Sequence, residues 1–166
     1  ATGYWETFTV AQGFEGVHAT SLVLTPESLW VGTKSKGVFR LDRQLMVWET
    51  YSPRNSAVGG NSITSMTATD TGVVATWYTT VAQGFRENAP GYSEWSDTAQ
   101  AWTNHKMGRD DITPEDIFGA YADGLLWIAT GGLLMSRFAN EWSSYEYPID
   151  IRGARIHSVT PDGQYV

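Results

Sequence analysis

A four-letter near-repeat constrains this chain more than any other feature: WETF at residues 5–8 returns as WETY at residues 48–51. The same pattern, Trp-x-x-aromatic or Trp-x-x-His, begins again at Trp102 and Trp142. The four tryptophans that begin this pattern are 43, 54 and 40 residues apart. Regular self-similarity with a period of 20–50 residues is typical of repeat architectures. The chain is therefore predicted to be built from recurring units of one kind.

A second series of segments follows the same rhythm: SLWVGT at 28–33, GVVATW at 72–77, LLWIAT at 125–130 and GQYV at 163–166. It makes Trp30, Val74, Trp127 and Tyr165 equivalent. An alternating segment that ends in a polar turn precedes each member of this series, as expected for a hairpin. A further strand is predicted after each of the first three members, at 37–42, 84–88 and 132–138. Each complete unit thus consists of four short strands.

Four-stranded antiparallel units of this length indicate an all-β protein, a β-propeller in which each unit is one blade. We predict one domain over residues 1–166 with about 3.5 to 4 blades, either complete or part of a larger ring. The expected parts are an outer strand of a closing or preceding blade at 1–9, blades at 19–52, 62–105 and 116–148, and an incomplete blade at 154–166. The segment APGYSEWSDTAQA at 89–101 is predicted to be an insertion that extends a surface hairpin.

Composition excludes several classes of function. The net charge of −7 argues against binding of nucleic acid, because that affinity rests mostly on Lys and Arg contacts to phosphate. The absence of cysteine excludes disulfides, thiolate metal sites and a cysteine nucleophile. No apolar run reaches about eighteen residues, so no transmembrane helix is expected. The chain begins at Ala1 rather than Met, for which a removed export signal is one explanation among several.

Three segments carry a resemblance to a known family: SLWVGTKSKGVFRLD at 28–42, NSITSMTATDTGVVATWYTT at 61–80 and GLLWIATGGLLMSRF at 124–138. They resemble the repeats of two-component-regulator-type β-propellers and are more loosely similar to those of streptogramin lyases. The second segment departs from the pattern because Val74 replaces the tryptophan. The resemblance implies an extracytoplasmic sensor or scaffold, periplasmic or secreted.

Propeller sites gather where the loops between the fourth and first strands meet those between the second and third strands. Polar residues in these loops are suited to recognising a small polar molecule. Trp95 lies outside both tryptophan series, so we expect it to be exposed and to be the main contact residue. Trp5, Trp48, Trp102 and Trp142 are instead expected to pack between blades. The predicted ligand- or partner-binding residues are Trp95, His18, Arg54, Tyr78, His105, Arg109, Asp111 and Arg152.

The favoured hypothesis is a non-catalytic recognition or assembly module that binds a small polar molecule or a protein partner. No cofactor or metal is expected, because His18, His105 and His157 occupy different places in the repeat. The acidic loop RDDITPED at 109–116 is interpreted as a solvated loop rather than a calcium site. One alternative is a structural subunit completed by a second copy or by the remainder of a larger propeller. The other is a lyase or glycoside hydrolase, for which Asp111, Glu115 and Asp150 would have to converge.

Overall fold

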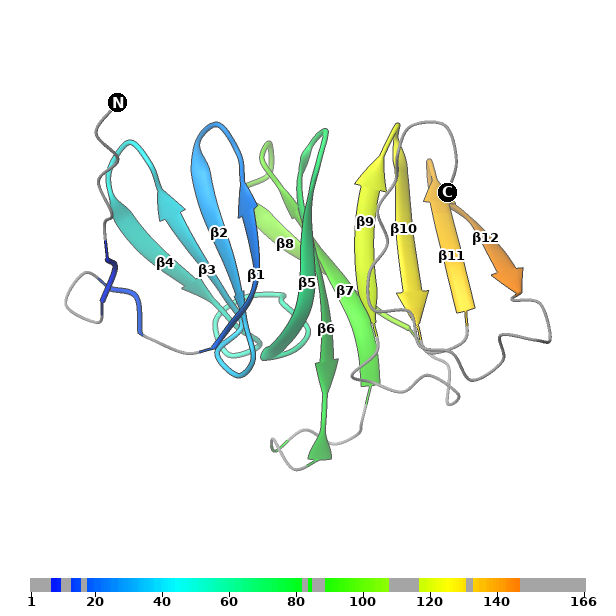
Figure 1. Ribbon diagram of the computed structural model, residues 1–166, viewed down its shortest axis with the longest axis horizontal. Helices are drawn as coiled ribbons and strands as arrows, with labels where there is room; N and C mark the ends of the chain where they lie inside the picture. The colour runs from blue at the N-terminus through cyan, green and yellow to red at the C-terminus, as the bar shows by residue number, and fades with distance from the viewer. Residues whose placement is uncertain are drawn as a thin grey trace.

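The computed structural model describes residues 7–9, 13–15, 18–81, 84, 89–107, 117–130 and 133–146. Within this part of the chain the strands form three four-stranded antiparallel sheets (Figure 1), which confirms the predicted all-β propeller architecture. None of the described residues forms a helix long and apolar enough to cross a membrane. The expected partial units at 1–9 and 154–166 lie outside the described residues, except for 7–9, and stay predictions.

In every sheet the strand order follows the chain, so each sheet is a simple meander. The first sheet contains β1 (Ala19–Leu24), β2 (Ser28–Thr33), β3 (Val38–Asp42) and β4 (Val47–Tyr51). The second contains β5 (Ser62–Thr69), β6 (Gly72–Thr79), β7 (Ala89–Ser96) and β8 (Ala101–Lys106). The third contains β9 (Phe118–Ala122), β10 (Leu125–Thr130), β11 (Leu133–Phe138) and β12 (Glu141–Glu146).

The sheets meet at their first strands, since β5 packs against β1 on one side and against β9 on the other. The last strands β4, β8 and β12 lie apart from one another (Figure 1). Serine side chains at two bulges join these inner strands: Ser21 Oγ accepts a hydrogen bond of 2.9 Å from the Met66 N–H, and Ser65 Oγ accepts one of 2.7 Å from the Gly119 N–H. The bulged strands thereby hold neighbouring blades together around a common centre.

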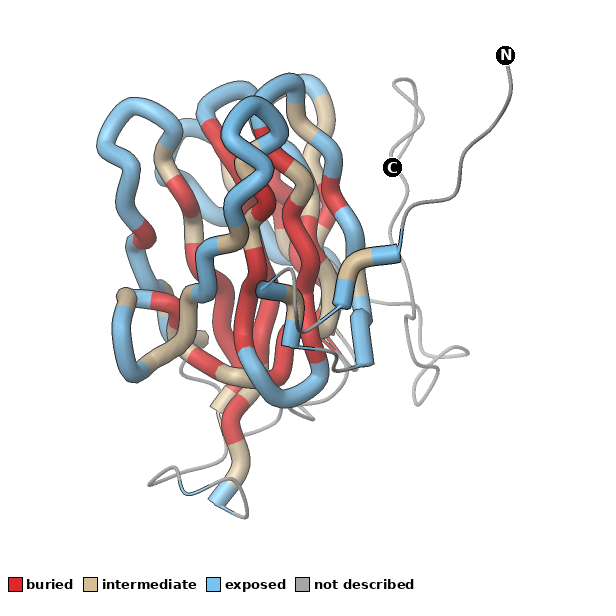
Figure 2. Tube along the Cα trace, turned by 90° about the vertical axis from the view of Figure 1, so that its left-hand side faces the viewer, coloured by how far each residue is buried: buried red, intermediate tan, exposed pale blue. Residues whose placement is uncertain are grey.

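Two apolar clusters fill the spaces between the sheets, and the middle sheet supplies both. Because side chains alternate along a strand, β6 sends Val73, Ala75 and Trp77 toward the first sheet and Val74 toward the third. Buried positions accordingly run along the strands while the connecting turns are exposed (Figure 2). The core therefore consists of two inter-sheet layers, which we call the first interface (first and second sheets) and the second interface (second and third sheets).

Two of the outer-strand tryptophans, Trp102 and Trp142, pack between blades as predicted. Trp102 on β8 lies 5.7 Å from Trp30 of the first sheet, and Trp142 on β12 lies 5.9 Å from Tyr92 of the second, measured between ring centroids. Trp48 on β4 contacts Phe8 at 5.6 Å and Phe14 at 5.1 Å on the far side of the first sheet. Trp5 lies outside the described residues.

The predicted exposure of Trp95 is wrong, whereas its predicted role in binding stays a prediction. The third strand of the second sheet is β7 at Ala89–Ser96, so these residues form a core strand instead of an insertion. Trp95 pairs with Trp102 across β7 and β8, faces the first sheet and is only 4% exposed. The strand expected at 84–88 lies outside the described residues, except for Gly84, and the observed third strand Ala89–Ser96 holds Pro90 near its beginning. Proline is tolerated there because it stands at the beginning of the strand.

Candidate ligand site at the second interface

The two interfaces can be compared position by position because the strands keep the same register. Trp30 pairs with Val23 and Arg40 in the first sheet, as Val74 pairs with Thr67 and Glu94 in the second. Trp30 and Val74 are therefore structurally equivalent, as the sequence repeat predicted. Trp127 occupies the same position in the third sheet, between Ala120 and Ser136.

Aromatic rings fill the first interface. Trp30 lies 5.3 Å from Trp95, 5.7 Å from Trp102 and 6.1 Å from Tyr51. The guanidinium of Arg40 lies over the Trp30 ring at 5.2 Å and over the Trp95 ring at 5.3 Å. Both of these tryptophans are almost completely buried. This interface is closed by stacked rings and a cation–π contact.

Different side chains occupy the equivalent positions of the second interface. Val74 stands in the place of Trp30, His105 in that of Tyr51, and Arg137 in that of Trp95. Tyr92, equivalent to the smaller Val38, fills part of the space that the missing indole leaves. Trp142 keeps the aromatic ring that Trp102 supplies in the first interface. The second interface thus has fewer tryptophans than the first and gains the Glu94–Arg137 pair beside its apolar cluster.

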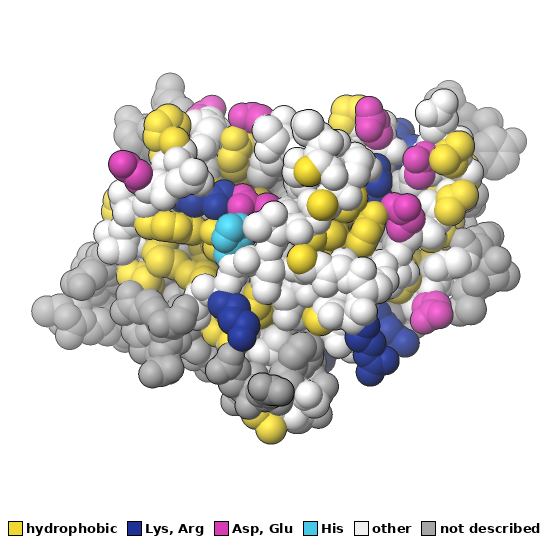
Figure 3. All heavy atoms as spheres, turned by 180° about the vertical axis from the view of Figure 1, so that it is seen from behind, with side chains coloured by type: hydrophobic (Ala, Val, Ile, Leu, Met, Phe, Trp, Pro, Cys, Tyr) yellow, Lys and Arg dark blue, Asp and Glu magenta, His cyan; other side chains and the backbone are white. Residues whose placement is uncertain are grey.

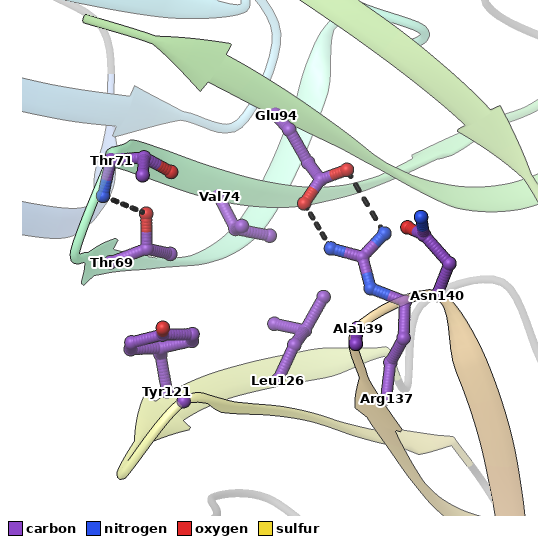
Figure 4. A pocket seen from close by; sticks show the side chains of 10 residues that line it. Thr69, Thr71, Val74, Glu94, Tyr121, Leu126, Arg137, Ala139 and Asn140 are labelled. Atoms are coloured by element: carbon purple, nitrogen blue, oxygen red, sulfur yellow. Dashed lines mark hydrogen bonds and ion pairs between the residues drawn. The ribbon is translucent and has the colours of Figure 1, made fainter.

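A cavity of about 150 Å³ remains between the second and third sheets (Figure 4). The side chains of Val74 and Leu126 face each other across it, and the Glu94–Arg137 pair closes one side. It lies near the turns β5–β6, β9–β10 and β11–β12. The lining residues are Thr69, Thr71, Val74, Glu94, Tyr121, Gly124, Leu126, Arg137, Ala139 and Asn140.

Two tight turns fix the third-sheet side of this cavity. Asp123 and Gly124 join β9 to β10 with φ of 51° and 78°, and Ala139 and Asn140 join β11 to β12 with φ of 50° and 92°. Two consecutive positive φ values define the hairpin turn whose twist matches that of the flanking strands, and Asp-Gly is its preferred sequence. The conformation of this side of the cavity therefore depends on the residues of these two turns.

An ion pair forms the polar side of the cavity. Arg137 Nη1 donates to Glu94 Oε2 at 3.0 Å and to the Tyr92 hydroxyl at 3.1 Å, while Nη2 donates to Glu94 Oε1. Burial by itself would lower the pKa of Arg137, but the hydrogen bonds and charge of Glu94, together with Tyr92, raise it above its ordinary value. The guanidinium also lies over the rings of Tyr92 at 5.4 Å and Trp142 at 5.7 Å. Arg137 is therefore a fixed cation at this site.

The tyrosines at the site stay protonated at neutral pH. Burial raises the pKa of Tyr121, and its hydrogen bond of 2.8 Å to Asp70 Oδ2 raises it further. Burial likewise raises the pKa of Tyr92, although Arg137 acts in the opposite direction. Within the described part of the chain, the side chains of Thr71 and Asn140 have no hydrogen-bond partner. The site thus offers hydroxyl and amide groups to a ligand beside a neutralised ion pair.

Among the predicted site residues that the structure describes, only His105 lies next to this cluster. Its imidazole stacks on the Tyr92 ring at 4.6 Å with an interplanar angle of 11°, and its Nε2 lies 2.9 Å from Glu94 Oε2 without the alignment of a hydrogen bond. Figure 3, the view from behind, shows a histidine beside acidic and basic side chains and next to hydrophobic surface. Its role in binding stays a prediction.

The other predicted site residues are not brought to this cavity. His18, Arg54 and Tyr78 lie at the opposite end of the sheets, where β1 begins and β4 and β6 end. There the carbonyl of His18 accepts a hydrogen bond of 3.0 Å from the Lys34 N–H. Arg109, Asp111 and Arg152 lie outside the described residues, as do Glu115 and Asp150 of the hydrolase alternative. Among the described residues, no three His, Asp or Glu side chains converge as they would to hold a metal ion.

Glu94 and Arg137 are not among the site residues predicted from the sequence. A signal existed, because Val74 departs from the tryptophan of its series, and a buried position that loses a large ring needs a compensating group. Which residues surround Val74 depends on the register of β7 and β11, which the sequence did not fix.

Comparison with known proteins supports the fold alone. No family model matches the chain, and no curated protein matches it. Among solved structures, the chain is similar to the extracellular domain of BT4673 from B. thetaiotaomicron, assigned to a hybrid two-component system, with a TM-score of 0.63, 15% identity and 80% of this chain covered. A second structure of the BT4673 domain, assigned to a one-component system, gives 0.61, 15% and 78%. The extracellular domain of the hybrid two-component system BT3049, from the same organism, gives 0.59, 16% and 84%.

The chain spans only 17% to 20% of the length of these neighbours. The match therefore concerns a small part of each of these longer chains. The likeness establishes that the three sheets are packed as in a β-propeller.

Proposed function

We propose that this chain is a non-catalytic recognition module of an extracytoplasmic sensor, periplasmic or secreted, and that the cavity at the second interface binds a small polar molecule. The observation that carries the proposal is the Glu94–Arg137 pair, which lines a cavity at the position where the first interface is filled by aromatic rings. The extracellular sensor domains among the structural neighbours support the setting.

The energetics of the ion pair favour this assignment over a purely structural one. A buried or half-buried ion pair contributes little net stability, because desolvation of both charges offsets their attraction. Apolar side chains such as those of the first interface would close the same space more effectively. Ligand sites commonly combine apolar walls with a few polar groups, and this cavity places Val74 and Leu126 beside Glu94 and Arg137.

A thermal-shift screen with small polar molecules tests the proposal. A ligand that binds only the folded chain must raise its melting temperature. The matched control is the double variant Glu94→Gln/Arg137→Met, which removes both charges together and so leaves neither one unpaired. We expect at least one compound to stabilise the wild-type chain and to leave the double variant unchanged. Equal stabilisation of both proteins, or no stabilisation by any compound, would contradict the proposal.

Assembly is a second candidate function, favoured by the outward face of the first sheet. Leu22 and Leu24 on β1 are 66% and 65% exposed there, and a groove of about 340 Å³ runs between β1, β2 and Trp48. Phe8 packs on Trp48 of this face at 5.6 Å, as Tyr51 packs on Trp102 at 5.9 Å in the first interface. The face therefore continues the inter-sheet packing of the molecule, and the occupant that we assign to it is a sheet from a second copy of this chain.

Sedimentation equilibrium tests whether the chain assembles through this face. A dimer or larger assembly is expected for the wild-type chain, and the variant Leu22→Glu/Leu24→Glu should be monomeric with an unchanged circular dichroism spectrum. Leu45→Glu is the control, since Leu45 is 70% exposed in the β3–β4 turn and lies off this face. A wild-type chain that stays monomeric at all concentrations would exclude a second copy as the occupant.

A further inference from the structure

We infer that the cavity at the second interface binds the carboxylate group of a small organic acid, and that Arg137 holds this group through the edge of its guanidinium that Glu94 leaves free. This inference rests on the proposed function and names the chemical class of the ligand. Its starting point is the use that Arg137 makes of its N–H groups within the described part of the chain.

An arginine guanidinium carries five N–H groups, two on each Nη and one on Nε. Arg137 Nη1 is engaged twice, with Glu94 Oε2 at 3.0 Å and with the Tyr92 hydroxyl at 3.1 Å. Nη2 is engaged once, with Glu94 Oε1. No described residue accepts a hydrogen bond from Nε or from the second hydrogen of Nη2. These two N–H groups are neighbours on one side of the guanidinium, which we call the free edge of Arg137.

The free edge belongs to a side chain of the cavity wall. Figure 4 shows both Nη atoms of Arg137 bonded to Glu94, with Val74 and Leu126 beside the guanidinium in the cavity. The side chain of Arg137 is only 17% exposed. A largely buried donor without an acceptor is unfavourable, so a ligand oxygen at this edge would stabilise the site.

The first interface contains an arginine whose Nε is already engaged. Arg40 Nε donates to Ser28 Oγ at 2.9 Å, and its Nη1 donates to Glu49 Oε2 at 3.4 Å and to Gln100 Oε1 at 3.3 Å. Arg40 thus uses its Nε within the protein, whereas Arg137 keeps the equivalent group available at a cavity. The difference points to a ligand group at the second interface.

A carboxylate is the group that fits two adjacent N–H donors. Its two oxygens accept both bonds at once, and such charge-assisted bonds are about twice as strong as neutral ones. Glu94 neutralises part of the charge of Arg137, so the geometry of the free edge matters more than the net charge of the site. Asp70, which accepts the hydrogen bond of the Tyr121 hydroxyl, is exposed, so water and salt screen its repulsion of an anion.

The remaining walls of the cavity describe the rest of the acid. Val74 and Leu126 offer apolar contact to a short hydrocarbon chain, and Thr71 and Asn140 offer a hydroxyl and an amide group. The cavity volume of about 150 Å³ limits the ligand to a small molecule. The ligand is therefore a small organic acid whose chain is short and either apolar or hydroxylated.

Propionate is the probe that tests this inference, and propionamide, which has the same shape and no charge, is its matched control. Titration of the full chain, followed by NMR at the backbone amides of β6 and β11, measures the affinity of each. We expect propionate to bind about tenfold more tightly than propionamide. Arg137→Lys keeps the positive charge but lacks the two-donor edge, so it should weaken propionate binding about tenfold. Arg40→Lys, at the first interface, is the control variant and should leave this binding unchanged.

Glu94→Gln keeps the test valid if Arg137→Lys folds poorly. The substitution removes the charge that neutralises Arg137, so propionate should bind about threefold more tightly than to the wild type. A gain in affinity cannot arise from a loss of folding.

The outcomes separate this inference from the proposed function. Equal binding of propionate and propionamide, unchanged binding to Arg137→Lys, or no binding of propionate would overturn the carboxylate assignment. If a neutral compound from the thermal-shift screen binds the wild type and not Glu94→Gln/Arg137→Met, the proposed function stands and only the carboxylate class fails. Acetylated trialanine, a peptide with a free C-terminal carboxylate, tests the source: tighter binding of this peptide than of propionate would overturn the assignment to a small acid.

Discussion

The two interfaces of this molecule have the same backbone arrangement and differ in how completely aromatic rings fill them. In the first, Trp30, Trp95 and Trp102 close the space between sheets with stacked rings. In the second, Val74 and Arg137 stand in two of those places, and a cavity lined by an ion pair remains. In a repeat fold, a few exchanges at equivalent positions are thus enough to leave a cavity in a layer that is otherwise packed. The departure from the repeat, more than the repeat itself, marks the candidate function.

The largest expected effect concerns the aromatic interface. Trp30→Ala removes a ring that is 1% exposed and contacts three other rings, so it should lower the free energy of unfolding by about 3–5 kcal/mol. Trp142→Ala, at the second interface, should cost less because Trp142 is 42% exposed. Urea unfolding followed by circular dichroism measures both values. Equal losses would show that the two interfaces contribute alike to stability.

The second expected effect concerns the ion pair. Glu94→Gln leaves the Arg137 guanidinium, which is 17% exposed, without its charged partner, so we expect a loss of about 1–3 kcal/mol. The double variant Glu94→Gln/Arg137→Met should recover much of that loss, because no uncompensated charge then remains. Thermal unfolding of the two variants gives the comparison. A double variant less stable than the single one would mean that the pair itself stabilises the second interface.

The third expected effect is a pH dependence at the first interface. Burial, with the hydrogen bond to Glu49, raises the pKa of Tyr51 to about 12. Because the unfolded chain releases this proton near pH 10 and the folded chain holds it to about pH 12, the contribution to stability is complete below pH 10 and is lost between those values. The partial exposure of the ring limits the effect to about 1 kcal/mol. Between pH 10 and about pH 12, the melting temperature of Tyr51→Phe should fall less steeply than that of the wild type. If both fall equally, the pH dependence belongs to other tyrosines.

The fold could be predicted from the sequence because its signal is periodic. Trp102 and Trp142 recur at fixed places in the unit, and residues that recur in this way pack against equivalent neighbours. Trp95 shows where this reasoning fails. Its strand contains Pro90 and does not follow a glycine as the other third strands do, so its register could not be predicted. Trp95 belonged to neither tryptophan series and was therefore expected to be exposed.

The candidate site was less predictable for a related reason. Val74 was recognised in the sequence as a departure from the repeat, yet its partners Glu94 and Arg137 come from two different sheets. Their approach depends on the register of β7 and β11 and on the packing of one sheet against the next. His105 is predicted as a site residue because it borders a loop. It lies beside the Glu94–Arg137 pair because it holds the last position of the Trp-x-x-aromatic pattern, where the other units carry an aromatic ring.

The smallest expected effect concerns the serines that join the inner strands, one at each interface. Ser21 Oγ accepts a single backbone hydrogen bond, from Met66, whereas Ser65 Oγ accepts one from Gly119 and also contacts Thr76 Oγ1 at 2.8 Å. Replacement by alanine leaves a backbone N–H without its partner and should cost about 1 kcal/mol at either position. Because Ser65 belongs to a network, Ser65→Ala should cost more than Ser21→Ala. Urea unfolding of the two variants measures the two losses of stability. Hydrogen exchange at the Gly119 and Met66 amides shows whether each backbone N–H has lost its protection. A smaller loss for Ser65 would mean that Thr76 takes over its bond, so that the second interface, despite its cavity, holds its inner strands as securely as the first.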